Sequence, residues 1–145
     1  MKTIELQFKG YFREANKSSI PNVSGVYCVY SCVYNETNKS VSIKSLLYIG
    51  ESKDLHDRIA NHDRLEDWMS SLLKGQILCY SYSKVQDADR ERAEAALIFT
   101  VQPEFNDEHK DQFIYEDTEI KTNGKNKFLP GRIVLKKGQK KWQVK

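Results

Sequence analysis

Two short segments, each built around a tyrosine and a glycine, constrain the fold of this chain most strongly. Gly25–Tyr27 reads Gly-Val-Tyr, and Leu47–Gly50 reads Leu-Tyr-Ile-Gly. Residues 26–34 and 41–49 are β-prone, and the polar residues 35–40 between them are typical of a turn. The sequence therefore predicts an antiparallel hairpin that carries both tyrosines.

A helical pattern follows the second glycine. Ser52 is expected to be the N-cap of a helix from about Lys53. Arg58 and His62 are four residues apart, so they project from one helical face. We expect one helix, or two helices broken near Asp63, from large residues at spacings of three and four: Leu55, Ile59, His62, Leu65, Trp68, Met69, Leu72 and Leu73.

A third strand and a further helix come next. Residues 76–85 are β-prone, and Asp87 is expected to cap a helix that ends before Pro103. Glu94 borders the core-facing side of this helix, where a carboxylate is costly unless it is paired or bound to a cation. Glu91, three residues earlier, is the alternative candidate for a metal ligand.

Charge is divided unevenly along the chain. Residues 121–145 hold nine Lys and Arg and no acid, whereas residues 1–120 hold 14 basic and 20 acidic side chains. This segment would attract a polyanion, or it is a solvated tail. Residues 132–135 and 141–144 flank a turn at 137–139 and predict a terminal β-hairpin.

Length and composition indicate one domain, since 145 residues build a single core. No apolar run approaches the roughly 20 residues that span a bilayer, and no signal peptide is evident, so we expect a cytoplasmic protein without a membrane segment. Cys28, Cys32 and Cys79 lack the spacings of zinc sites or disulfide frameworks. Cys28 and Cys32 share a strand face, where buried small hydrophobes are favoured over metal ligands.

The chain resembles the GIY-YIG nuclease family over residues 25–106. Five features occur in order: the two tyrosine segments, the Arg58-to-His62 spacing, Glu94 on the later helix, and Asn106 after Pro103. The resemblance implies an α/β (α+β) fold with a small, three-stranded, largely antiparallel sheet flanked by helices. We expect this nuclease domain to occupy residues 1–120, with residues 121–145 as a basic C-terminal extension.

The resemblance also implies roles for six residues. Tyr27 would be the general base or would orient the attacking water, and Tyr48 would contact the phosphate. Arg58 would hold the non-bridging oxygens, and Glu94 would bind one divalent cation, Mg²⁺ or Mn²⁺. His62 would assist Tyr27 as a proton acceptor, and Asn106 would support the site by hydrogen bonds.

The chain departs from the family pattern in two ways. Twenty residues separate the two tyrosines, which is longer than the compact family spacing. A lysine that some members place near the phosphate has no unique counterpart, and Lys39, Lys44 and Lys53 are all candidates. Val26 in place of the family's Ile is a conservative change.

The expected activity is metal-dependent hydrolysis of DNA by an endonuclease. Its partners would be DNA and, for targeting, a further protein. The alternative is a module on the same scaffold that binds nucleic acid or protein without cutting. We expect the C-terminal segment to contact the DNA backbone through Lys136, Lys137, Lys140 and Lys141, with Trp142 stacking on a base.

Overall fold

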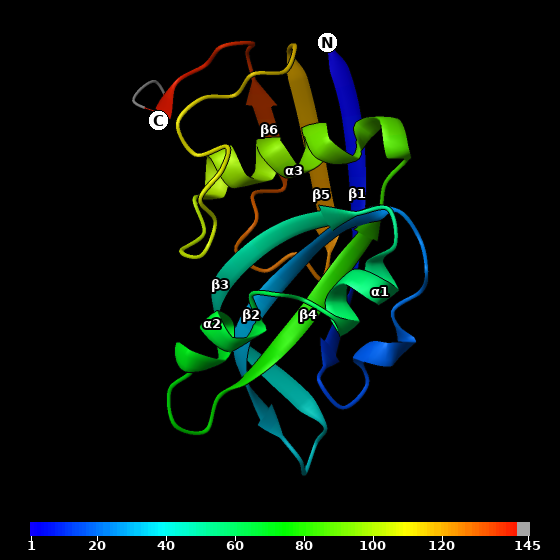
Figure 1. Cartoon of the computed structure of the whole chain (residues 1–145), viewed down its shortest axis with the longest axis vertical. Coiled ribbons are helices and arrows are strands. Elements are labelled where there is room, and N and C mark those ends of the chain that lie inside the picture. The colour runs from blue at the N-terminus through cyan, green and yellow to red at the C-terminus, as the bar shows by residue number, and fades with distance from the viewer. Residues whose placement is uncertain (142–145) are drawn as a thin grey trace.

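The computed structural model describes residues 1–141 and shows a mixed α+β fold. Six strands form one sheet in the order β3-β2-β4-β1-β5-β6 (Figure 1). The strands are β1 Lys2–Arg13, β2 Gly25–Asn35, β3 Ser40–Ser52, β4 Ile77–Lys84, β5 Thr118–Gly124 and β6 Arg132–Leu135. The helices are α1 Leu55–Ala60, α2 Leu65–Ser70 and α3 Asp87–Val101, with a 3-10 turn at Lys17–Ser19.

The predicted hairpin is confirmed as β2 and β3. These strands pair antiparallel, with Tyr27 opposite Gly50 and Val29 opposite Tyr48. The predicted third strand is β4, which pairs antiparallel with β2 on its other side and places Tyr82 opposite Tyr27. The strand that carries Tyr27 is therefore central and held from both sides.

The prediction of three strands is wrong, because β1 extends the sheet. The second half of β1 pairs antiparallel with β4, and its first half pairs parallel with β5. Ile4, Leu6 and Phe8 alternate with exposed residues along β1. That period of two is the signal by which β1 could have been found from sequence.

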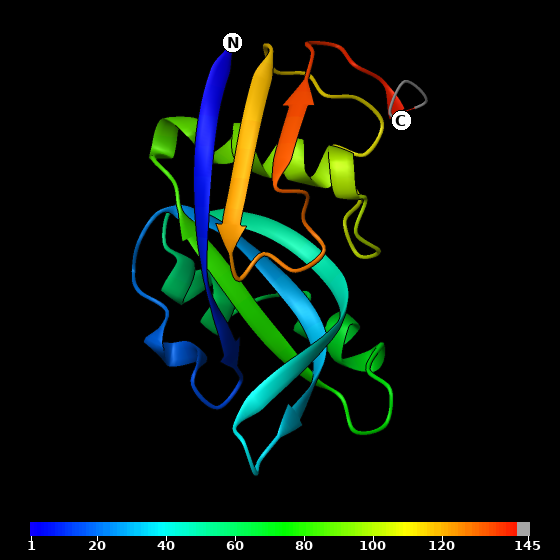
Figure 2. The ribbon, with the colours of Figure 1, turned by 180° about the vertical axis from the view of Figure 1, so that it is seen from behind.

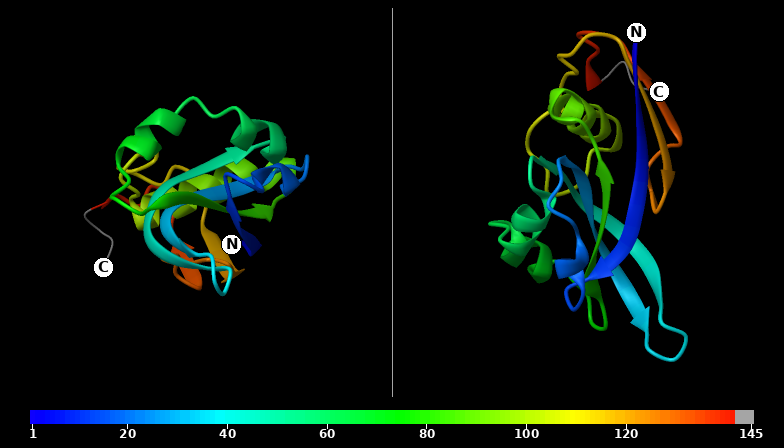
Figure 3. Two further views of the ribbon diagram at one scale, coloured as in Figure 1. Left: turned by 90° about the horizontal axis from the view of Figure 1, so that it is seen from below. Right: turned by 90° about the vertical axis from the view of Figure 1, so that its right-hand side faces the viewer.

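The sheet curls around α3. This helix contacts β3 and β6, the two edge strands of the sheet (Figure 2). Its small residues Ala93, Ala95 and Ala96 are buried, which lets the helix pack close. Helices α1 and α2 pack instead beside β2 to β4, as the side view in Figure 3 shows.

The alternation of side chains along β2 separates two hydrophobic clusters. Val26, Cys28 and Tyr30 belong to the cluster under α3, which we call the α3 cluster. Tyr27 and Val29 belong to the cluster under α1 and α2. Because Tyr27 lies on the α1–α2 face, the residues of these short helices decide its surroundings.

The helix boundaries differ in detail from the prediction. The N-cap of α1 is Asp54, whose side chain accepts from the Asp57 N–H, whereas Ser52 Oγ accepts from the Asp54 N–H. The chain then breaks near Asp63 into two helices, which was one of the two alternatives. Helix α3 begins at Asp87, so its N-cap is Gln86 and not Asp87 as predicted. It ends at Val101, and its C-cap Gln102 has a left-handed conformation just before Pro103.

The second strand of the predicted terminal hairpin, residues 141–144, lies outside the described residues except for Lys141. Its first strand is β6, which pairs antiparallel with β5. The expected boundary at residue 120 falls inside β5, and Ile133 and Leu135 are buried in the α3 cluster. The basic segment is thus part of the sheet as far as Leu135.

Two of the three cysteines are paired, although none of them has the spacing of a disulfide framework in the sequence. Cys32 on β2 and Cys79 on β4 are joined, with their Cα atoms 6.3 Å apart. Cys28 is free and buried, as expected of a small hydrophobe. A cytoplasmic location stays a prediction, and this disulfide would not persist in a reducing compartment.

Within residues 1–141, no helix combines the length and the apolar character needed to cross a membrane.

The C-terminal strand should contribute to stability. We expect Ile133→Ala to lower the free energy of unfolding by about 2–5 kcal/mol, because Ile133 is 5% exposed and its loss leaves a cavity. Val134→Ala is the matched control, since Val134 is 38% exposed, and should cost about 0.5 kcal/mol or less. Urea denaturation of both variants measures the difference, and equal, small costs would show that β6 is not part of the core.

Candidate functional site

Three of the predicted residues meet at one place on the α1–α2 face. The ring centroids of Tyr27 and Tyr48 lie 6.3 Å apart, and that of His62 lies 5.4 Å from Tyr48. His62 Nε2 is 2.6 Å from the Tyr27 hydroxyl. Trp68, from α2, packs against the imidazole with its centroid 4.3 Å away. The short helices therefore hold His62 over the hairpin.

The two glycines of the sequence motif make this packing possible. A Cβ on Gly50 would lie 2.3 Å from the ring of Tyr27 on the neighbouring strand. A Cβ on Gly25 would lie 2.1 Å from the Ser83 carbonyl oxygen and 2.9 Å from the side chain of Leu55. Glycine is required at both positions because another strand, or a side chain of α1, approaches the backbone closely.

His62 is held as a neutral hydrogen-bond donor. Its pKa is lowered to about 4, chiefly by burial and then by the positive charge of Arg58. Its Nδ1 accepts from the Arg64 N–H at 3.0 Å, so the single proton of the neutral ring lies on Nε2. Nε2–H then donates to the Tyr27 oxygen. In this arrangement His62 is a donor to Tyr27 and not the proton acceptor that we expected.

Tyr27 is a difficult group to ionise in the free protein. It is 1% exposed, and burial raises its pKa, as does the neighbouring phenol of Tyr48. Arg58 lowers the pKa of Tyr27 but does not outweigh burial. The Arg58 side chain is 39% exposed and lies 3.5 Å from Asp63, so it remains accessible to an anion.

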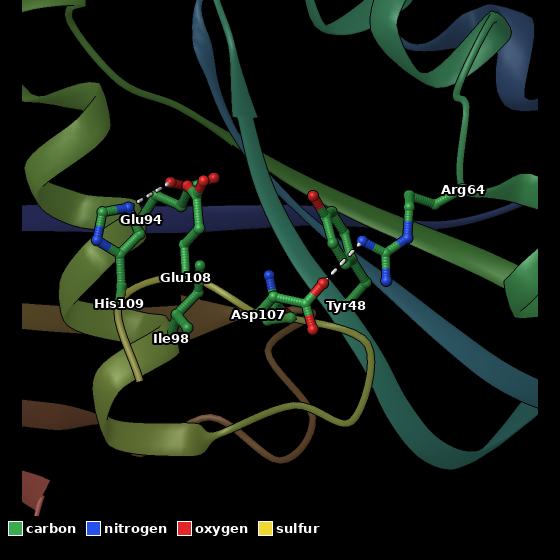
Figure 4. A pocket seen from close by; sticks show the side chains of 8 residues that line it. Tyr48, Arg64, Glu94, Ile98, Asp107, Glu108 and His109 are labelled. Carbon is green, nitrogen blue, oxygen red and sulfur yellow. Dashed lines mark hydrogen bonds and ion pairs between the residues drawn. The ribbon is translucent and has the colours of Figure 1, made fainter. Parts of the chain in front are cut away.

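Glu94 faces Tyr48 across a cavity of about 210 Å³ (Figure 4). Its Oε1 lies 3.7 Å from His109 Nε2. The cavity lies between α3, the edge of β3 and the loop after α3. Its lining residues are Tyr48, Arg64, Glu94, Ile98, Asn106, Asp107, Glu108 and His109.

The carboxyl group of Glu94 is unusually hard to ionise. Its pKa is raised to about 8, chiefly by burial and then by the neighbouring acids Glu51, Glu108 and Glu91. All four acids line a second hollow of about 390 Å³ that adjoins the first at Glu94. Glu94 is thus a carboxylate surrounded by like charges.

This donor set fits a hard divalent cation. Residues 1–141 contain no preassembled group of three or more His, Cys, Asp or Glu ligands. Mg²⁺ needs only one or two protein carboxylates, because it keeps several of its waters. Glu94 lines both hollows, whereas the exposed Glu91 lines only the outer one, which favours Glu94 as the ligand.

Asn106 positions β3. Its side-chain oxygen accepts from the Ile49 N–H at 2.9 Å, and its amide donates to the Ile49 carbonyl at 2.8 Å. This pair of bonds ties the loop after α3 to the edge strand beside Tyr48. The supporting role expected of Asn106 is consistent with these contacts.

Arg64 lies in the site although the sequence analysis did not single it out. It donates to the Phe105 carbonyl at 2.7 Å, lies 3.4 Å from Asp107, and sits 5.7 Å above the ring of Tyr48. Its place two residues after His62 is the only signal in the sequence. None of Lys39, Lys44 and Lys53 lines the cavity.

The predicted DNA-contacting residues lie elsewhere. Lys136 and Lys137 form ion pairs with Asp117 and Glu116. The backbone of Lys140 pairs with that of Gln112 in an isolated antiparallel β-bridge, and the Lys141 N–H donates to the Asp111 carbonyl. Trp142 lies outside the described residues. None of the four described lysines lines the cavity.

Comparison with known proteins gives no match: no family model, no curated protein and no solved structure matches the chain significantly.

The raised pKa of Glu94 should make stability depend on pH and on cations. Folded Glu94 holds its proton up to about pH 8, so its favourable contribution is lost as pH rises from about 4.5 to 8. We expect the free energy of unfolding of Glu94→Gln to exceed that of the wild type at pH 8 by on the order of a few kcal/mol. This difference should be smaller at pH 5.

Thermal unfolding at both pH values measures this effect, with Glu91→Gln as the control. Mg²⁺ or Mn²⁺ should raise the midpoint of the wild type at pH 8 and leave that of Glu94→Gln unchanged. The same rise in both proteins would place the cation elsewhere.

Proposed function

We propose that this protein is a divalent-metal-dependent endonuclease of the GIY-YIG type that hydrolyses DNA phosphodiester bonds. One observation carries the proposal. Residues chosen from their spacing in the sequence surround one region: Tyr27, Tyr48, Arg58 and His62 on the side of the short helices, and Glu94 on α3.

The proposed chemistry uses the hydrogen bond between His62 and Tyr27. Tyr27 acts as its phenolate, so its own proton is first lost to solvent when the substrate binds. The phenolate then takes the proton of the attacking water, the hydroxide forms the new bond to phosphorus, and the bond from phosphorus to the leaving oxygen breaks. The His62 Nε2–H and the charge of Arg58 both stabilise negative charge on the Tyr27 oxygen, which offsets the cost of burial. His62 thus positions and activates Tyr27 without itself accepting the proton.

The phosphate would bind between the two sides of the cavity. Arg58 holds its non-bridging oxygens, and Tyr48 contacts it from β3. Arg64 adds positive charge above the Tyr48 ring. A divalent cation on Glu94 would neutralise the leaving oxygen, which is the chemistry that such an ion supplies. Asn106 keeps β3 in register with α3.

One observation favours the alternative, a scaffold that binds nucleic acid or protein without cutting. Tyr27 and the side chain of His62 are each 1% exposed, so water does not reach the Tyr27 oxygen directly. Hydrolysis therefore requires the side chains around Tyr27 to move when the substrate binds. The two functions differ in whether metal-dependent cleavage occurs.

Cleavage assays on a panel of duplex, flapped and branched DNA test the proposal. We expect cleavage that requires Mg²⁺ or Mn²⁺ and that is abolished in Glu94→Gln. Glu91→Gln is the matched control, one helical turn away, and should cleave nearly as the wild type does. No cleavage of any substrate by the wild type would support the binding module, and equal loss in both variants would make the choice of Glu94 wrong.

Tyr27→Phe and Arg58→Ala should each slow the cleavage step by about a hundredfold or more, the range that general bases and oxyanion-stabilising groups supply. DNA binding should persist in both variants. Single-turnover rates from pH 6 to 9 measure the effect. If Tyr27→Phe cleaves at the wild-type rate throughout, Tyr27 is a structural residue of β2 and another base acts.

A further inference from the structure

A third hollow, of about 520 Å³, is distinct from the two beside Glu94 and lies far along β2 from the candidate catalytic residues. It is formed by the end of β1, the tip of the β2–β3 hairpin and the loop after β5. We call it the basic groove. It is lined by Gly10, Tyr11, Arg13, Asn16, Tyr34, Lys39, Ser40, Val41 and Lys125.

The basic groove opens on the opposite face of β2 from Tyr27. Tyr34 is four residues after Tyr30, so the two side chains share a face. Tyr30 belongs to the α3 cluster, and Tyr11 packs edge-on against it at 5.4 Å. Tyr27 belongs to the α1–α2 cluster. The groove is therefore separate from the candidate catalytic site.

Three cations line the groove without an acid. Arg13, Lys39 and Lys125 contribute positive charge, and no Asp or Glu is among the lining residues. None of the three forms an ion pair with a carboxylate in the described part of the chain. Unpaired like charges that share one concave site repel one another, and this repulsion is relieved when an anion binds.

Aromatic rings accompany these charges. The Arg13 guanidinium lies 3.9 Å from the centroid of the Tyr34 ring, which is partly exposed. Phe128 is 49% exposed on the loop after β5, with the Lys127 ammonium 5.6 Å from its ring centroid. Cations interleaved with accessible aromatic rings are the combination by which proteins hold a single strand, through phosphate contacts and base stacking.

We propose that the basic groove binds a single-stranded segment of nucleic acid, as a contact site apart from the position of cleavage. Arg13, Lys39 and Lys125 contact the phosphates, and Tyr34 stacks on a base. The inference rests on the proposed function in taking nucleic acid as the ligand, but it needs no catalysis. It also replaces Lys136 and Lys137, which pair with acids of their own chain, as the main backbone contacts.

Binding measurements in EDTA test this inference without cleavage. The probes are a labelled oligothymidine and a duplex of the same length, and the protein is the full chain. The double variant Lys39→Gln with Lys125→Gln removes two groove charges. Its control, Lys136→Gln with Lys137→Gln, removes the same net charge where the lysines are already paired.

We expect the groove variant to lower the slope of log K against log salt for oligothymidine by about 1.4, at about 0.7 for each lost contact to a single strand. The control should change the slope much less. Tyr34→Leu should weaken oligothymidine binding by about fivefold or more, leave duplex binding nearly unchanged and keep the salt slope, because it removes only stacking.

The remaining outcomes of these measurements each contradict one part of the proposal. Equal slopes for the two double variants would mean that binding follows net charge and that the groove is not a site. Loss of duplex and oligothymidine binding to the same extent in Tyr34→Leu would remove the single-strand assignment. Groove-dependent binding with no metal-dependent cleavage would uphold the groove and reject the nuclease. Metal-dependent cleavage by the wild type, together with unaltered binding in the groove variants, would uphold the nuclease and reject the groove.

Discussion

The close approach of the Tyr27 ring to Gly50 is the contact on which the site depends. The ring occupies the space that a Cβ on the neighbouring strand would take. This places the Tyr27 hydroxyl under His62, where Nε2–H can reach it. Gly25 plays the matching part at the start of β2, because the absence of a side chain lets Leu55 bring α1 close. The hydrogen bond between His62 and Tyr27 therefore depends on both glycines and on the position of α1.

The double pairing of β1 makes the chain one unit. Because β1 pairs with β4 and then with β5, the C-terminal strands continue the sheet that carries Tyr27. The acids before and within β5 then meet the basic residues of β6 and its loop, as in the pair of Arg132 with Glu119. Three of the positive charges that suggested a DNA-binding tail in the sequence are therefore paired with acids of their own chain: Arg132, Lys136 and Lys137.

The sequence predicted the parts of the fold that depend on local signals. The β2–β3 hairpin, β4 and α3 follow from periodicity, turn residues and Pro103, all within short windows. The partners of β1, β5 and β6, and the Cys32–Cys79 pair, depend on strands distant in sequence, which no local pattern specifies. The alternation of buried and exposed residues over 2–9 is, by contrast, a local signal for β1.

The candidate site residues could be predicted because their spacing is also a local signal. Their protonation states could not be predicted in this way. Spacing predicted that Arg58 and His62 share a helix and that Glu94 lies on the inner side of α3. Because helix α1 ends at Ala60, His62 lies between α1 and α2 and not on the helix of Arg58. The tautomer of His62, however, depends on the Arg64 N–H, and the pKa of Glu94 depends on acids from β3 and from the loop after α3. These interactions arise only when separate segments pack together.

The distribution of charge couples the two ligands of the proposed reaction. Without a cation, the acids around Glu94 would repel a phosphate that approaches Arg58, since Glu51, Glu91 and Glu108 line one hollow with it. A divalent cation on Glu94 would convert this repulsion into attraction. Because such coupling is reciprocal, bound phosphate would also strengthen cation binding. The acidic surroundings that make Glu94 costly to ionise would therefore keep the site from binding a phosphate firmly until the metal is present.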